Sequence, residues 1–116
     1  MTVVDDRTST WIDVCAVDVI TPDRGVAARI ADRQIALFVL STGDVYALDN
    51  RDPFSAANVL CNGIIGDHNG VPTVASPVYK QRFALATGKC LDDPDVSVAR
   101  WEARIDGGRV LVREPR

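Results

Sequence analysis

The side chains that most often carry metal-binding or nucleophilic chemistry are scarce in this sequence, which has one histidine and three cysteines. Cys15, Cys61 and Cys90 stand at wide, unrelated spacings, a pattern typical of neither a zinc site nor a disulfide framework. We interpret all three as reduced thiols. His68 lies in a polar, glycine-containing segment (66–70) that favours a surface turn. One such histidine cannot supply a paired metal site or a catalytic triad.

A group of carboxylates is the remaining candidate for a metal site, because Ca²⁺ prefers oxygen ligands. Asp92, Asp93 and Asp95 stand close together, but Pro94 interrupts them and no EF-hand pattern is present. A solvated turn is therefore the favoured interpretation. No glycine-rich loop opens a helix, which argues against a phosphate site. The sequence predicts that this chain carries no catalytic residues of its own.

Length, composition and charge narrow the possible functions. The chain has 116 residues, 47% of them hydrophobic, and a formal net charge of −3. These values suit one folded domain, which we place at 11–116, after a flexible segment at 1–10 without a signal-peptide core. An acidic surface repels phosphate and anionic lipid, which argues against nucleic-acid and membrane binding. The longest apolar run, 35–40, is too short to span a membrane.

The elements that would position any site are strands. β-Branched residues number 30, and 14 of the 16 acidic residues are aspartates, which favour turns. Alternating patterns predict strands at 11–17, 25–30, 34–41, 45–49, 73–75, 81–85, 97–105 and 109–113. The apolar run in the third of these predicts burial on both faces. Periodicity disappears from 50 to 72, which predicts one long loop in an all-β fold, a small antiparallel β-sandwich or barrel.

Two segments resemble the cluster-binding loops of Rieske domains, which hold a [2Fe–2S] centre. Residues 45–54 (VYALDNRDPF) are similar to the strand and first loop, which in that family continues into Cys-x-His. Residues 74–90 (VASPVYKQRFALATGKC) resemble the second loop, Cys-Pro-x-His, with the strand and Thr-Gly turn that follow it. The resemblance covers about residues 11–112. It implies a Rieske-like fold with one long loop in place of the cluster-binding region.

The chain departs from the Rieske pattern at all four ligand positions. The two cysteine positions fall on Asp52 and Ser76, and the two histidine positions fall on Phe54 and Tyr79. A Rieske centre needs two thiolates on one iron and two imidazole nitrogens on the other. Phenylalanine has no donor atom, hydroxyl groups rarely ionise at neutral pH, and one carboxylate cannot hold a cluster. We therefore expect no metal and no cofactor in this chain.

Losing a cluster would remove the link between two long loops. Phe54 and Tyr79 would place large rings where imidazoles point in the Rieske family, and ring packing can close a gap of that size. We expect these two rings to lie on adjacent loop tips and to hold the loops together.

Four segments (50–55, 63–67, 76–83 and 87–94) resemble one cluster-less branch of the Rieske family, the NirD-type small subunits of nitrite reductase. The resemblance includes the exchange of all four ligand positions. It implies a non-catalytic small subunit of the cytoplasmic, assimilatory NAD(P)H-dependent enzyme, which reduces nitrite to ammonium. The catalytic partner would be a large subunit carrying FAD, an iron–sulfur cluster and sirohaem. Alone, the small chain would have no activity.

The former cluster loops also carry cations and aromatic side chains, which are typical of protein interfaces. Ordinary surface charge is the alternative interpretation. The expected interface residues are Arg51, Phe54, Tyr79, Lys80 and Arg82. Two other functions stay open: a Rieske-type ferredoxin or oxygenase electron-transfer component with atypical ligands, and a β-barrel module for small ligands or single strands.

Overall fold

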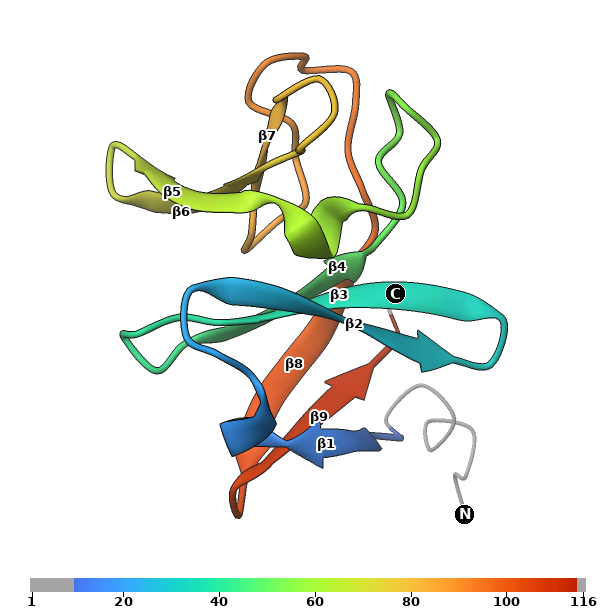
Figure 1. The fold of residues 1–116 in the computed structure, drawn as a ribbon, viewed down its shortest axis with the longest axis vertical. Coiled ribbons are helices and arrows are strands. Elements are labelled where there is room, and N and C mark those ends of the chain that lie inside the picture. Colours follow the sequence, from blue (N-terminus) through green and yellow to red (C-terminus); the bar gives the residue numbers. More distant parts are fainter. Residues whose placement is uncertain (1–9, 115–116) are drawn as a thin grey trace, which may run out of the picture.

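Nine strands in two antiparallel sheets make up nearly half of residues 10–114, the part of the chain that the computed structural model describes (Figure 1). The six-stranded sheet has the order β1-β9-β8-β4-β3-β2, and the three-stranded sheet has the order β5-β6-β7. The strands are β1 (Ile12–Ala16), β2 (Arg24–Ile30), β3 (Arg33–Val39), β4 (Val45–Asp49), β5 (Ile64–His68), β6 (Val71–Ala75), β7 (Arg82–Ala84), β8 (Arg100–Asp106) and β9 (Arg109–Arg113). This architecture confirms the predicted all-β fold. The flexible segment predicted at 1–10 lies, except for Thr10, outside the described residues.

Strand β3 is buried on both faces, as its continuous apolar run predicts. Its odd-numbered residues Ile35, Leu37 and Val39 pack in one core, and its even-numbered residues Ala36 and Phe38 pack in the other. Because successive side chains of a strand point to opposite faces, a strand between two cores must be apolar throughout. This strand therefore joins the two halves of the molecule.

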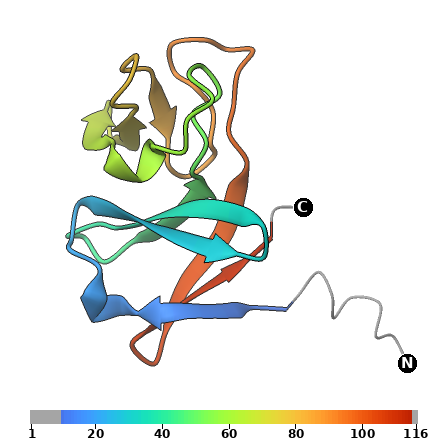
Figure 2. The ribbon, with the colours of Figure 1, turned by 45° about the vertical axis from the view of Figure 1, so that its right-hand side comes forward.

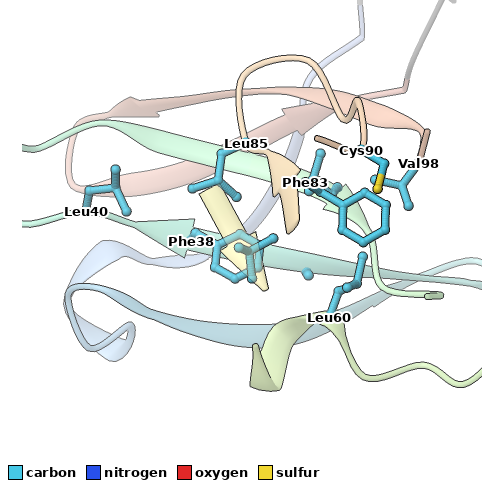
Figure 3. Close-up of a cluster of buried hydrophobic side chains, with 10 residues drawn as sticks. Phe38, Leu40, Leu60, Phe83, Leu85, Cys90 and Val98 are labelled. Atoms are coloured by element: carbon cyan, nitrogen blue, oxygen red, sulfur yellow. The ribbon is translucent and has the colours of Figure 1, made fainter. Parts of the chain in front are cut away.

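The two cores have different surroundings. In the first, the six-stranded sheet curls so that β1 and β9 lie opposite β2 and β3 (Figures 1 and 2). Its centre is Trp101, which is 1% exposed and whose Nε1–H donates to the Asp49 carboxylate over 2.8 Å. The second core lies between the two sheets (Figure 3) and contains Phe38, Leu60, Phe83 and other apolar side chains.

The prediction of one long loop at 50–72 is wrong in its second half. A short 3-10 turn, η2 (Leu60–Asn62), is followed by β5 and by the start of β6. These two strands form a hairpin around Asn69 and Gly70, whose φ angles are 54° and 86°. Positive φ at both central residues is the geometry of a tight hairpin turn, and Asn-Gly is its strongest sequence signal. The segment predicted as a surface turn at 66–70 is therefore the end of a hairpin.

Smaller differences concern strand ends. The first predicted strand gives way to a second 3-10 turn, η1 (Val17–Val19), and the predicted strand at 97–105 begins only at Arg100. Ser97 instead forms an isolated bridge to Lys89. Cys90 forms another isolated bridge, to Phe83. Within residues 10–114 no helix has the length and apolar character needed to cross a membrane.

Candidate functional site

Two loops lie at one end of the molecule, above the six-stranded sheet (Figures 1 and 2). We call residues 50–59, between β4 and η2, the first loop, and residues 76–81, between β6 and β7, the second loop. Each loop is closed by its own backbone hydrogen bonds. The Asp52 N–H donates to the Ala57 carbonyl over 2.8 Å, and the Ser76 N–H donates to the Gln81 carbonyl over 2.9 Å. Each loop is therefore closed internally as well as joined to the other loop.

A buried hydrogen bond joins the two loops. The Ser76 hydroxyl donates to Asp52 Oδ2 over 2.5 Å, and these residues are 1% and 0% exposed. They are the two residues that the Rieske resemblance places at cysteine positions. A hydroxyl–carboxylate bond of this length is charge-assisted and stronger than a neutral one. The link between the loops is thus made by these two side chains.

The Asp52 carboxylate accepts further hydrogen bonds from its own loop. The Phe54 N–H donates to Oδ1 over 2.9 Å, and the Ser55 hydroxyl donates to Oδ2 over 3.0 Å. Burial by itself would raise the pKa of Asp52. The hydrogen bonds from Ser76, Phe54 and Ser55 outweigh burial and hold that pKa below its ordinary value of 3.8. Asp52 is therefore a buried, charged carboxylate that accepts hydrogen bonds from three residues.

The predicted ring pair between Phe54 and Tyr79 is replaced by a different pair. Phe54 packs against Phe83 of β7, with ring centroids 6.2 Å apart and planes inclined by 46°. Through Phe83 it joins the core between the sheets. Tyr79 is 61% exposed, so its ring points into solvent rather than closing the gap. Phe54 thus holds the first loop to the three-stranded sheet.

The three predicted interface cations differ in their availability. Arg51 and Lys80 are exposed. Arg82 pairs with Asp92, with Nη2 and Oδ1 2.9 Å apart, and the backbone N–H of Arg82 also donates to the Asp92 carboxylate over 2.8 Å. These bonds lower the pKa of Asp92 and raise the pKa of Arg82. The charge of Arg82 is therefore compensated within the chain.

Asp92 is the residue here whose role sequence patterns missed. It lies in the segment interpreted as a solvated turn, ten positions after its partner Arg82, a spacing that carries no periodic signal. Nearby, Arg82 Nη1 lies 3.4 Å from Nδ1 of the exposed His68. The three cysteines are free thiols, of which Cys90 is buried. The thiols are dispersed over β1, η2 and the second core rather than gathered at the loops.

The residues at the loops do not fit a [2Fe–2S] cluster. The Phe54 side chain offers no donor atom, the Ser76 hydroxyl proton is committed to Asp52, and Asp52 already accepts three hydrogen bonds. Among the described residues no three His, Cys, Asp or Glu side chains gather in a way that could hold a metal ion.

Comparisons with known proteins agree with the fold and extend it. Residues 10–113 match the Rieske-like [2Fe-2S] domain. The chain is 44% identical over 106 residues to the "Nitrite reductase (NADH) small subunit" of Escherichia coli K12, a match that covers 90% of this chain and 98% of that protein. The NMR structure of E. coli NirD resembles the fold with a TM-score of 0.83 at 43% identity, covering 90% of this chain and 96% of that one.

A further similarity is to part of a much longer protein. The chain is 46% identical over 103 residues to the "Nitrite reductase [NAD(P)H] large subunit" of Klebsiella oxytoca. The match covers 88% of this chain but 11% of that protein. A domain of this kind therefore also occurs within a large-subunit polypeptide.

Proposed function

This chain belongs to the Rieske-like [2Fe-2S] domain family, in its nitrite reductase small-subunit branch, and on that premise we propose that it is the non-catalytic small subunit of a cytoplasmic, assimilatory NAD(P)H-dependent nitrite reductase. The observation that carries the proposal is the 44% identity that extends over 98% of the E. coli small subunit. Its role is to bind the large subunit, which reduces nitrite to ammonium. FAD, an iron–sulfur cluster and sirohaem belong to that large subunit, and the isolated small chain has no activity.

The large subunit of K. oxytoca supports a direct association. A domain that is fused to a polypeptide in one system and separate in another usually works beside the same partner. Fusion only raises the local concentration of the domain at that partner, whereas a separate chain must reach the partner by binding it. The segment of that protein similar to this chain spans most of the domain, since it covers 88% of the residues here. We therefore take the large subunit as the partner, and neither nucleic acid nor a membrane.

The two loops are the surface we propose for this association. Val78 and Tyr79 are 44% and 61% exposed beside the exposed Lys80, so the second loop offers apolar, aromatic and cationic groups together. Such a mixture is typical of interface anchors. Phe54 and Arg82 are held from within, and we assign them the positioning of the loops. Of the five residues in the proposed interface, Arg51, Tyr79 and Lys80 would contact the large subunit, and Phe54 and Arg82 would hold the loops in place.

The chemistry of three of the four positions that carry cluster ligands in Rieske domains supports a role without electron transfer. Asp52 and Ser76 are consumed in the link between the loops, and Phe54 is packed on Phe83. No electron step is routed through this chain. Its contribution lies in contact with the large subunit, whose active site it orders or whose assembly it assists.

Co-purification with the large subunit of the same organism tests this function. We expect the two chains to elute together, and nitrite-dependent NAD(P)H oxidation to be higher with the small chain than without it. The iron content and visible spectrum of the isolated small chain form the second measurement. Colourless protein is expected. Stoichiometric iron with a [2Fe–2S] spectrum would favour the ferredoxin alternative, and separate elution with unchanged activity would contradict the proposal.

A further inference from the structure

A surface pocket of 290 Å³ lies beside the first loop, between that loop and the β2–β3 turn. It is distinct from the exposed second loop, and arginines dominate its wall. The residues lining it are Arg29, Asp32, Arg33, Gln34, Arg51 and Asn58.

Two of these arginines form no ion pair with a carboxylate of residues 10–114. Within residues 10–114 five of the nine arginines form ion pairs, namely Arg33, Arg82, Arg104, Arg109 and Arg113. Arg29 and Arg51 form none of these pairs. Both side chains are exposed and line the same pocket. Arg33 is neutralised by Asp49 at 2.8 Å, which leaves Asp32 as the remaining carboxylate at the rim. The pocket therefore carries a local excess of positive charge in a chain whose formal net charge is −3.

The pocket wall is held in shape from below. Asn50, which is 1% exposed, donates through Nδ2 to Gln34 Oε1 and to the Asn58 carbonyl, each over 3.2 Å. Its Oδ1 accepts the Cys61 N–H over 2.7 Å. A backbone bridge between Arg51 and Asn58 closes the first loop at the same place. The two segments that carry the unpaired arginines are thus fixed relative to each other.

We propose that this pocket receives a carboxylate side chain of the large nitrite reductase subunit. The inference rests on the proposed function and names a contact within it. Guanidinium groups bind carboxylates through two parallel hydrogen bonds, and a carboxylate between Arg29 and Arg51 would offset their unpaired charge. Arg51 also belongs to the proposed loop interface, so the pocket continues that surface. An electrostatic contact of this kind mainly sets the orientation and the rate of association.

Charge reversal tests the contact. Arg29→Glu, Arg51→Glu and the double variant are compared with unmodified protein for binding to the purified large subunit, at 50 and 300 mM NaCl. Lys89→Glu is the control for each single variant, and Lys89→Glu combined with Arg100→Glu is the control for the double variant, because each control changes the net charge by the same amount at exposed residues outside this pocket. We expect the double variant to weaken binding at least tenfold at low salt and to lose most of the salt dependence, with both controls within twofold. Circular dichroism checks that each variant is folded.

Each alternative outcome has a separate meaning. Binding of the double variant within twofold of the unmodified chain would overturn the pocket contact and leave the proposed function intact. Equal weakening by the charge-matched controls would also overturn it, because the effect would then come from net charge. If nitrite or phosphate stabilises the unmodified chain but not the double variant, and large-subunit binding is equal, the pocket takes a small anion instead. If the unmodified chain fails to bind the large subunit, the proposed function falls together with this inference.

Discussion

The curled six-stranded sheet and the two loops above it are held by different forces. The sheet encloses an apolar core around Trp101 and Leu37, in which many small contacts share the stabilisation. The loops depend on a few polar bonds around one carboxylate, Asp52, and on one aromatic contact to β7 of the three-stranded sheet. The comparison teaches that a region can keep its shape after its proposed metal link is replaced, provided that a buried polar network takes over. Such a network depends on fewer atoms than an apolar core does.

The largest effect is expected in the sheet. Trp101→Ala would remove a fully buried indole and leave a cavity, and the hydrogen bond to Asp49 would be lost with it. We expect a loss of about 3–5 kcal/mol in the free energy of unfolding, a large part of the total for a domain of this size. Urea denaturation followed by circular dichroism measures the loss. The control is Ile64→Ala, since Ile64 is 72% exposed and its truncation should change stability by less than about 0.5 kcal/mol. Equal effects of the two variants would contradict the described core.

The second prediction concerns the link between the loops. Asp52→Ala would leave the Ser76 hydroxyl and the Phe54 N–H buried without their acceptor, which costs about 2 kcal/mol. Hydrogen exchange should increase most at amides of 52–57 and 76–81, and much less in β3. Asp44→Ala is the matched control, because Asp44 is exposed and accepts from Thr42 at the surface. Uniform exchange across the molecule would show that the loops do not form a separately stabilised region.

Sequence patterns predicted the sheet better than the loops for a physical reason. The apolar run of β3 identifies burial on both faces, because burial selects side chains directly. The link between Asp52 and Ser76 joins residues 24 positions apart and leaves no local pattern. The Rieske resemblance does pair these positions, since it assigns both to cysteines. The prediction instead takes Phe54 and Tyr79 as the link, because large rings at the histidine positions can close a gap by packing.

The missed hairpin has a different cause. The sequence around Asp67 and His68 is polar, so β5 shows no buried face, and it lies at the edge of its sheet. The dipeptide Asn69-Gly70 was the available signal, and the pairing of β5 with β6 is read from that turn rather than from hydrophobicity. The availability of the proposed interface residues was also hard to predict. Arg82 pairs with Asp92 only because the folded chain brings them together, and no local sequence pattern marks that contact.

The third prediction uses pH to separate the two regions. Hydrogen bonds lower the pKa of Asp52 in the folded state, so the ionised carboxylate stabilises the fold. This stabilisation is fully present above the unfolded pKa near 3.8, and it is lost as pH falls through the lower pKa of the folded state. The difference in unfolding free energy between the unmodified chain and Asp52→Asn should therefore shrink as pH decreases from about 5 to about 2. The Trp101→Ala difference, measured in parallel urea denaturations, should change much less over the same range. A constant difference for Asp52→Asn would contradict the charged network.

The smallest stability effect is expected at the tip of the second loop, where it should oppose the effect on function. Lys80 has a φ of 67°, a left-handed conformation that costs a non-glycine residue energy. Lys80→Gly removes that strain, partly offset by the greater freedom of glycine in the unfolded chain, so we expect a gain of about 0.5 kcal/mol in thermal unfolding. Binding to the large subunit should nevertheless weaken a few-fold, because an exposed interface cation is lost. Lys80→Arg keeps both the charge and the backbone strain, so it should match the unmodified chain in both measurements. If Lys80→Gly gained stability and bound the large subunit normally, the strain at this position would have no connection with docking, and the interface would have to lie elsewhere on the loops.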